Sequence, residues 1–217
     1  MIVVVGLPAY TDGPDGEECA GGLAVEVAAS AGRRGGTVEL VGKVGNDGTG
    51  DAVVVALGRL GIGHAALLRD PARPTPVLTA TQRGESADAA PEEPETRLLP
   101  EDPAARPALE AADVELALRY LPQASVIVLA DPMAASTVEA GIQGAAFSAA
   151  RLIVLVAPGA VAPPVPPGTT VLEAPGEDDG SFGRLVGTFA GALEAGLDPA
   201  AAFSEAVVTS GWEPVAD

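Results

Sequence analysis

The chain has 217 residues, and its 30 acidic and 12 basic side chains give a formal net charge of −18. Because affinity for polyanions comes from neutralising phosphates, this excess of acid argues against nucleic acids and anionic membranes as partners. Cys19 is the only cysteine and His64 the only histidine, which excludes an intrachain disulfide and a zinc site built on these residue types. We therefore expect no metal site and a reducing, cytoplasmic environment.

Short β-branched runs alternate along the chain with longer alanine-rich segments that glycines bound, a pattern typical of parallel strands joined by crossover helices. The predicted strands are Ile2–Val5, Val38–Val41, Pro76–Ala80, Val126–Ala130, Leu152–Val156 and Thr170–Leu172. The predicted helices are Gly22–Ala31, Gly48–Leu60, Val114–Leu121, Ser136–Ala149, Phe182–Ala195 and Pro199–Thr209. This order predicts an α/β fold of three layers, a Rossmann-like αβα sandwich with a mainly parallel central sheet.

The composition changes between residues 83 and 115, where Glu, Asp, Pro and Ala dominate and large apolar side chains are few. Such a segment cannot bury much apolar surface, so we expect an exposed acidic connection within a single domain that spans residues 1–217. An acidic docking surface is the alternative interpretation of the same composition.

The most informative segment lies between residues 19 and 63. The pair Gly21 and Gly22 opens a small-residue helix, a strand follows, and a loop with Gly42, Gly45, Asp47 and Gly50 leads into a second helix. This order resembles the first signature of the ribokinase or PfkB carbohydrate-kinase family and implies a ribokinase-like fold. An ordinary βαβ unit with glycine at its turns is the alternative. We expect a tight connection between residues 42 and 50, with Asp47 turned either toward the N–H groups of the helix or toward solvent.

A polar loop with glycines runs into the helix predicted near Phe182, and it resembles a remnant of the second signature of the same family. The resemblance places the anion hole on Gly180, Ser181, Phe182 and Gly183, and it places the catalytic aspartate on Gly183. The residue that would remove the proton from a substrate hydroxyl is therefore missing. Asp178 and Asp179 stand nearby and could replace it if the loop were shifted.

The substrate-binding residues implied by the resemblance are Asp12, Gly21, Gly22, Glu26, Gly45 and Asp47. Two of them depart from the family pattern, because Glu26 stands where an asparagine is usual and Asp12 is one residue out of register. The chain between Asp12 and Gly21 is too short for the usual lid strands, so we expect a reduced lid. Only about ten residues remain where the family encloses the nucleotide, which is the length of a simple connection.

These observations leave two functions open. The first is a divergent ribokinase-like protein with little or no phosphotransfer activity, which acts as a small-molecule-binding or structural protein. Its ligand would be a small sugar or nucleoside. The second is an active minimal kinase that uses a displaced acidic residue together with ATP and Mg²⁺. The missing base and the shortened nucleotide and lid segments favour the first. On the first interpretation, the N–H groups of residues 180–183 are expected to bind a sulfate or phosphate while catalysis is absent. A homodimer is left open.

Overall fold

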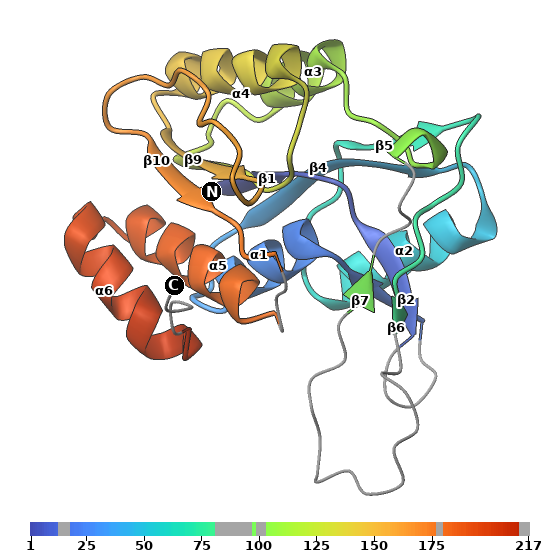
Figure 1. Cartoon of the computed structure of the whole chain (residues 1–217), viewed down its shortest axis with the longest axis horizontal. Coiled ribbons are helices and arrows are strands. Elements are labelled where there is room, and N and C mark those ends of the chain that lie inside the picture. Colours follow the sequence, from blue (N-terminus) through green and yellow to red (C-terminus); the bar gives the residue numbers. More distant parts are fainter. Residues whose placement is uncertain (13–17, 81–96, 99–102, 177–179, 213–217) are drawn as a thin grey trace, which may run out of the picture.

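A computed structural model describes residues 1–12, 18–80, 97–98, 103–176 and 180–212 (Figure 1). Its main sheet has the strand order β10-β9-β8-β1-β4-β5, and every neighbouring pair in it is parallel. These strands are β1 (Ile2–Val5), β4 (Val38–Gly45), β5 (Leu67–Asp70), β8 (Val126–Leu129), β9 (Arg151–Val156) and β10 (Thr170–Glu173). The prediction of a mainly parallel central sheet is confirmed.

Helices cover both faces of this sheet, which makes the three predicted layers (Figure 1). The helices on one face are α1 (Leu23–Gly32), α2 (Gly48–Arg59), α5 (Ser181–Glu194) and α6 (Pro199–Ser210). Those on the other face are α3 (Ala111–Tyr120) and α4 (Ala135–Ser148), and the short 3₁₀ helix η1 (Pro103–Ala105) precedes α3. All six predicted helices are present, with ends that differ by a few residues from the predicted ones.

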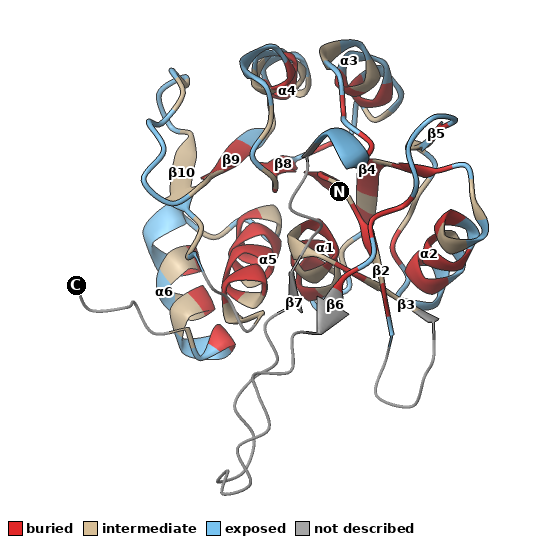
Figure 2. Cartoon of the chain, turned by 45° about the vertical axis from the view of Figure 1, so that its right-hand side comes forward, coloured by how far each residue is buried: buried red, intermediate tan, exposed pale blue. Residues whose placement is uncertain are grey.

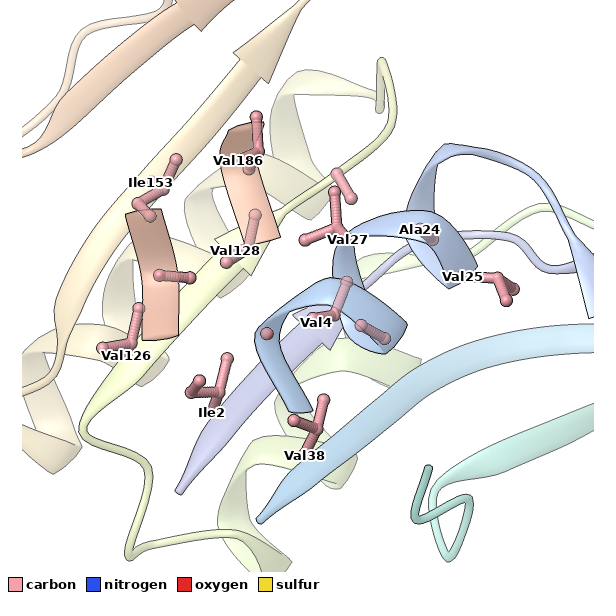
Figure 3. Packing of buried hydrophobic residues seen from close by; sticks show 14 of the residues in the cluster. Ile2, Val4, Ala24, Val25, Val27, Val38, Val126, Val128, Ile153 and Val186 are labelled. Carbon is pink, nitrogen blue, oxygen red and sulfur yellow. The ribbon is translucent and has the colours of Figure 1, made fainter. Parts of the chain in front are cut away.

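The central strand β1 explains why the protein has two aliphatic cores. Successive side chains of a strand point to opposite faces, so Ile2 and Val4 pack with α1 and α5, whereas Val3 and Val5 pack with α3 and α4. Figure 3 shows Ile2 and Val4 of β1 in the first core, to which Val128 of β8 and Val186 of α5 also belong. Buried residues follow α5 along most of its length (Figure 2), so this helix lies within the core.

Helices α1 and α5 pack closely because α5 presents glycines to α1 at every fourth position. A Cβ placed on Gly187 would lie 2.6 Å from the Cβ of Ser30 and would also meet the carbonyl oxygen of Val27. A Cβ on Gly191 would lie 3.2 Å from the carbonyl oxygen of Ala31. The stripe begins at Gly183, so the first turn of α5 is held against the first turn of α1.

A second group of strands lies beside the carboxyl end of β1. Strands β2 (Ala9–Asp12) and β3 (Glu18–Gly21) are antiparallel, as are β6 (Thr79–Ala80) and β7 (Arg97–Leu98). Hydrogen bonds between Tyr10 and the chain at Pro76 and Leu78 join β2 to the segment that leads into β6. The short segment between Asp12 and Gly21, where a reduced lid was expected, ends in β3, which pairs with β2.

Other predicted elements also needed correction. Strand β5 was not predicted, because its sequence, Leu-Leu-Arg-Asp, contains no β-branched residue. Strand β4 continues to Gly45 and α2 begins at Gly48, so only residues 46–47 of the loop expected between Gly42 and Gly50 lie outside these elements. Only residues 79–80 of the predicted strand 76–80 form a strand. Most of the exposed connection expected between residues 83 and 115 lies outside the described residues. In the part that is described, Pro107 and Leu109 before α3 and Val114 within it are buried, so the chain is already packed there. In the described parts of the chain, no helix is long and apolar enough to cross a membrane.

Candidate functional site

The parallel strands all end at one edge of the sheet, and the chain reverses its direction of winding there between β1 and β8. From β1 the chain goes to β4 and β5, and it then returns to the other side of β1 as β8, β9 and β10. In open parallel sheets, ligands bind beyond the carboxyl ends of the strands at such a reversal. This edge, with the loops after β1 and β8 and the first turns of α1, α2 and α5, is the candidate site.

The first turn of α2 is held by Asp47, the N-cap residue. One carboxylate oxygen accepts hydrogen bonds from the Gly50 N–H at 2.7 Å and the Thr75 hydroxyl at 2.7 Å, and the other accepts from the Thr75 N–H at 2.8 Å. The Thr75 hydroxyl in turn accepts from the Gly45 N–H at 2.9 Å. The expectation that Asp47 turns toward the start of the helix is confirmed, and Asp47 binds three groups of its own chain.

The same network sets the pKa of Asp47 and leaves little room near it. Burial raises the pKa of this carboxyl, but the hydrogen bonds from Thr75 and Gly50 outweigh burial, and the net effect lowers the pKa. A Cβ on Gly50 would lie 2.5 Å from the Gly45 carbonyl oxygen and 2.6 Å from Arg69 Nη1. The residues Gly45, Asp47 and Gly50 thus join two strand ends to a helix, which is why the glycine pattern is needed there.

Asp131 is a further carboxylate at the same edge, and it was not among the site residues predicted from the sequence. It follows β8, and its Oδ2 accepts a hydrogen bond from the Leu7 N–H, just after β1, at 2.5 Å. Desolvation raises the pKa of Asp131 to about 6, although the Leu7 N–H and the Arg106 guanidinium act in the opposite direction. Its position directly after a buried strand and before Pro132 was the available signal, because polar residues at strand ends gather at this edge.

The first turn of α5 comprises the four residues assigned to an anion hole. Gly180 is the N-cap, with a left-handed φ of 84°, and Ser181 is the first helical residue. Phe182 is buried and its ring lies 6.5 Å from that of Trp212, between centroids. Its side chain therefore belongs to the core rather than to an open, glycine-lined anion site.

Glu26, in the first turn of α1, lies directly against the position from which the aspartate is missing. A Cβ placed on Gly183 would lie 2.7 Å from the Glu26 Cβ and 2.7 Å from its Oε2. A Cβ on Gly180 would lie 3.5 Å from the same oxygen and 3.4 Å from Arg184 Nη1. The structure brings Glu26 together with Gly180 and Gly183, and the carboxylate stands where side chains of these glycines would be.

The other predicted site residues are spread along the same edge. Asp12 is exposed at the end of β2, where its Oδ1 accepts a hydrogen bond from the Tyr10 hydroxyl at 2.9 Å. Gly21 ends β3, and Gly22 is the N-cap of α1 with a φ of 95°. Asp178 and Asp179 lie outside the described residues. Within the described ranges, no three Asp, Glu, His or Cys side chains gather as a metal site requires.

The sequence matches no protein-family model and no curated protein, whereas the fold has clear relatives among solved structures. An uncharacterized sugar kinase from Pyrococcus horikoshii superimposes with a TM-score of 0.52 at 21% identity, over 71% of this chain and 52% of that chain. This chain therefore spans about half the length of that kinase.

Two further structures align over a larger share of both chains. A putative ribokinase II from E. coli gives a TM-score of 0.68 at 13% identity, over 96% of this chain and 91% of that chain. Arabidopsis thaliana ribokinase, solved with ribose and ATP, gives 0.65 at 15% identity, over 96% and 90%. The likeness extends from the first strand to the last helices, and the chain therefore has the ribokinase-like fold that its glycine pattern indicated.

Proposed function

We propose that this protein binds a small hydroxylated molecule, of the sugar or nucleoside class, at the carboxyl edge of its sheet and transfers phosphate to it little or not at all. The observation that carries the proposal is Gly183. It stands where the resemblance requires the proton-removing aspartate, and the space that such a side chain needs is filled by Glu26. A glycine has no group that can accept the proton of an attacking hydroxyl.

Three features support ligand binding at this edge. The fold is shared with an E. coli protein solved with ATP and Mg²⁺ and with a ribokinase solved with ribose and ATP. The chain winds in opposite directions from β1, which is where ligands enter folds of this class. The lid strands β2 and β3 rise beside it, and Asp12 at their end offers a carboxylate to ligand hydroxyls.

Calorimetric titration with ATP and Mg²⁺, followed by an assay for phosphorylated product with a panel of sugars and nucleosides, tests this proposal. We expect a measurable heat of binding for at least one sugar or nucleoside, weak or absent binding of ATP, and no phosphorylated product. The variant Gly183→Asp should show at most a trace of activity, because a positioned base contributes typically about 10²–10⁴-fold and does not rebuild a nucleotide site.

The active minimal kinase is the outcome that would overturn the proposal. It would be established if the wild-type protein formed product and if Asp178→Asn or Asp179→Asn abolished that activity without unfolding the chain. ATP and Mg²⁺ would then be its cofactors.

A further inference from the structure

The first turn of α5 lacks the side chains that usually complete a helix start. Its N-cap is Gly180 and its third helical position is Gly183, so neither position can supply an oxygen to the N–H groups of the turn. In the common capping arrangement, side chains at these two positions accept hydrogen bonds from these groups. An acceptor for this turn must therefore come from elsewhere, whether from the solvent, a ligand or another part of the chain.

The carboxylate of Glu26 stands in the space that these two missing side chains would share. Its Oε2 is 2.7 Å from a Cβ placed on Gly183 and 3.5 Å from one placed on Gly180. The glycine stripe of α5 brings α1 close enough for this approach, because a Cβ on Gly187 would already meet Ser30. Tight packing of α1 against α5 thus holds the Cβ of Glu26 beside Gly183.

A negative charge at this point decides what else can bind there. The positive end of a helix dipole attracts an anion, and a carboxylate of the chain satisfies it as well as a phosphate does. A second anion would lie within a few ångströms of Glu26 and would be repelled by it. The Arg184 guanidinium lies near the same turn, with its Nη1 3.4 Å from a Cβ placed on Gly180, so the turn also carries a cation.

We propose that Glu26 is a built-in anion that occupies the first turn of α5 and keeps phosphate groups out of it. Glu26 thereby determines specificity, because it leaves the edge of the sheet open to neutral hydroxylated molecules and closed to nucleotides and sugar phosphates. This inference rests on the proposed function, whose weak phosphotransfer it explains. It reverses the expectation from the sequence that residues 180–183 bind a phosphate.

Titration of inorganic phosphate by calorimetry into three variants and the wild-type protein tests the proposal. Glu26→Ala empties the space, Glu26→Gln keeps its shape without the charge, and Glu139→Ala removes one carboxylate from α4 on the opposite face of the sheet. We expect no measurable binding by the wild-type protein or Glu139→Ala. Glu26→Ala should bind phosphate at least about tenfold more tightly than the upper limit that the titration sets on the wild-type affinity, which is the size expected for removing one close like charge from a partly exposed site.

Each result separates this inference from the proposed function. Phosphate binding that is equal in the wild-type protein and both Glu26 variants overturns the inference and leaves the proposed function standing. Absence of binding in Glu26→Ala and Glu26→Gln, with both folded by circular dichroism, overturns it as well. If the wild-type protein forms phosphorylated product and Glu26→Gln abolishes it, Glu26 is the displaced base, and the inference and the proposed function both fail.

Discussion

Helices α2 and α5 begin at the same edge of the sheet, and their first turns are completed in different ways. The turn of α2 takes its acceptor from its own N-cap residue, Asp47, which also binds the N–H and hydroxyl of Thr75. The turn of α5 has glycine at the corresponding positions and has Glu26 of α1 beside it. In the first case the carboxylate locks two loops together; in the second it fills a position that a catalytic residue would need.

The difference shows that two corners at the same sheet edge can differ in how their first helical turns are completed, while the glycine pattern of the fold is kept at both. The α2 corner keeps its pattern because the fold depends on it, since the loop after β5 is tied to the end of β4 through Asp47. The α5 corner keeps the feature on which its packing depends, the glycine stripe toward α1.

The largest effect should come from Asp47→Ala. This change removes the cap of α2 and leaves the N–H and hydroxyl of Thr75 without their acceptor, so the free energy of unfolding should fall by about 3 kcal/mol. Urea denaturation measures it. Asp51→Ala, in the same turn, is the matched control, because Asp51 is exposed and pairs at the surface with Arg69, its one ion-pair partner among the described residues. Its cost should stay below about 0.5 kcal/mol. Equal losses in the two variants would show that the α2 corner is not held by Asp47.

The next effect is the cost of Gly183→Asp, which tests the contact at the α5 corner. The new side chain meets the Cβ and carboxylate of Glu26 at 2.7 Å, so we expect a loss of about 2 kcal/mol from overpacking and like charge. Adding Glu26→Asn should recover at least half of the loss, whereas adding Glu139→Ala should recover none. If the changes in the free energy of unfolding caused by the Gly183 and Glu26 substitutions simply add in a double-mutant cycle, the two side chains do not interact.

A smaller loss is expected from Thr75→Val, which keeps the shape of the side chain but removes its hydroxyl. The Asp47 carboxylate then loses one of its three donors, and the buried Gly45 N–H loses its acceptor, at a cost of about 1.5 kcal/mol. Thr75→Ser retains the hydroxyl and should lose clearly less. If thermal unfolding shows the two variants to be equally destabilised, packing of the methyl group rather than the hydrogen bonds accounts for the role of Thr75.

The α2 corner could be predicted from the sequence because its determinants are local. Gly45, Asp47 and Gly50 lie within six residues of one another, and an Asp before a helix is a recognisable cap. The sheet and helices were predictable for the same reason, from runs of β-branched or alanine-rich residues. The contact of Glu26 with Gly183 joins positions far apart in the chain, and the sequence could show only that each departs from the family pattern.

Asp131 was missed because a single carboxylate after a strand produces no periodic signal, and only the parallel pairing of β1 with β8 brings it to Leu7. The sequence also gave no sign of β5, since its pairing with β4 supplies what its composition lacks. Strand pairing is a long-range property, so these features require the fold itself.

The smallest effect concerns Asp131, which lies between the two corners and accepts from one described N–H, whereas Asp47 accepts from three donors. Its pKa is raised to about 6, above the unfolded value of about 3.9, so the native state binds more protons in this interval. Stability contributed by protonated Asp131 is therefore present at low pH and is lost as the pH rises through about 6.

The variant Asp131→Asn keeps an oxygen for the Leu7 N–H and carries no charge at any pH. It should melt a few degrees above the wild-type protein at pH 8, and the difference should shrink toward zero as the pH falls to about 4. Asp47 has the opposite sign: its lowered pKa stabilises the fold at neutral pH, and this contribution is lost on acidification. Melting curves of Asp131→Asn and the wild-type protein between pH 4 and 8 measure the effect. A constant difference across this range would show that the Asp131 carboxyl does not titrate near 6.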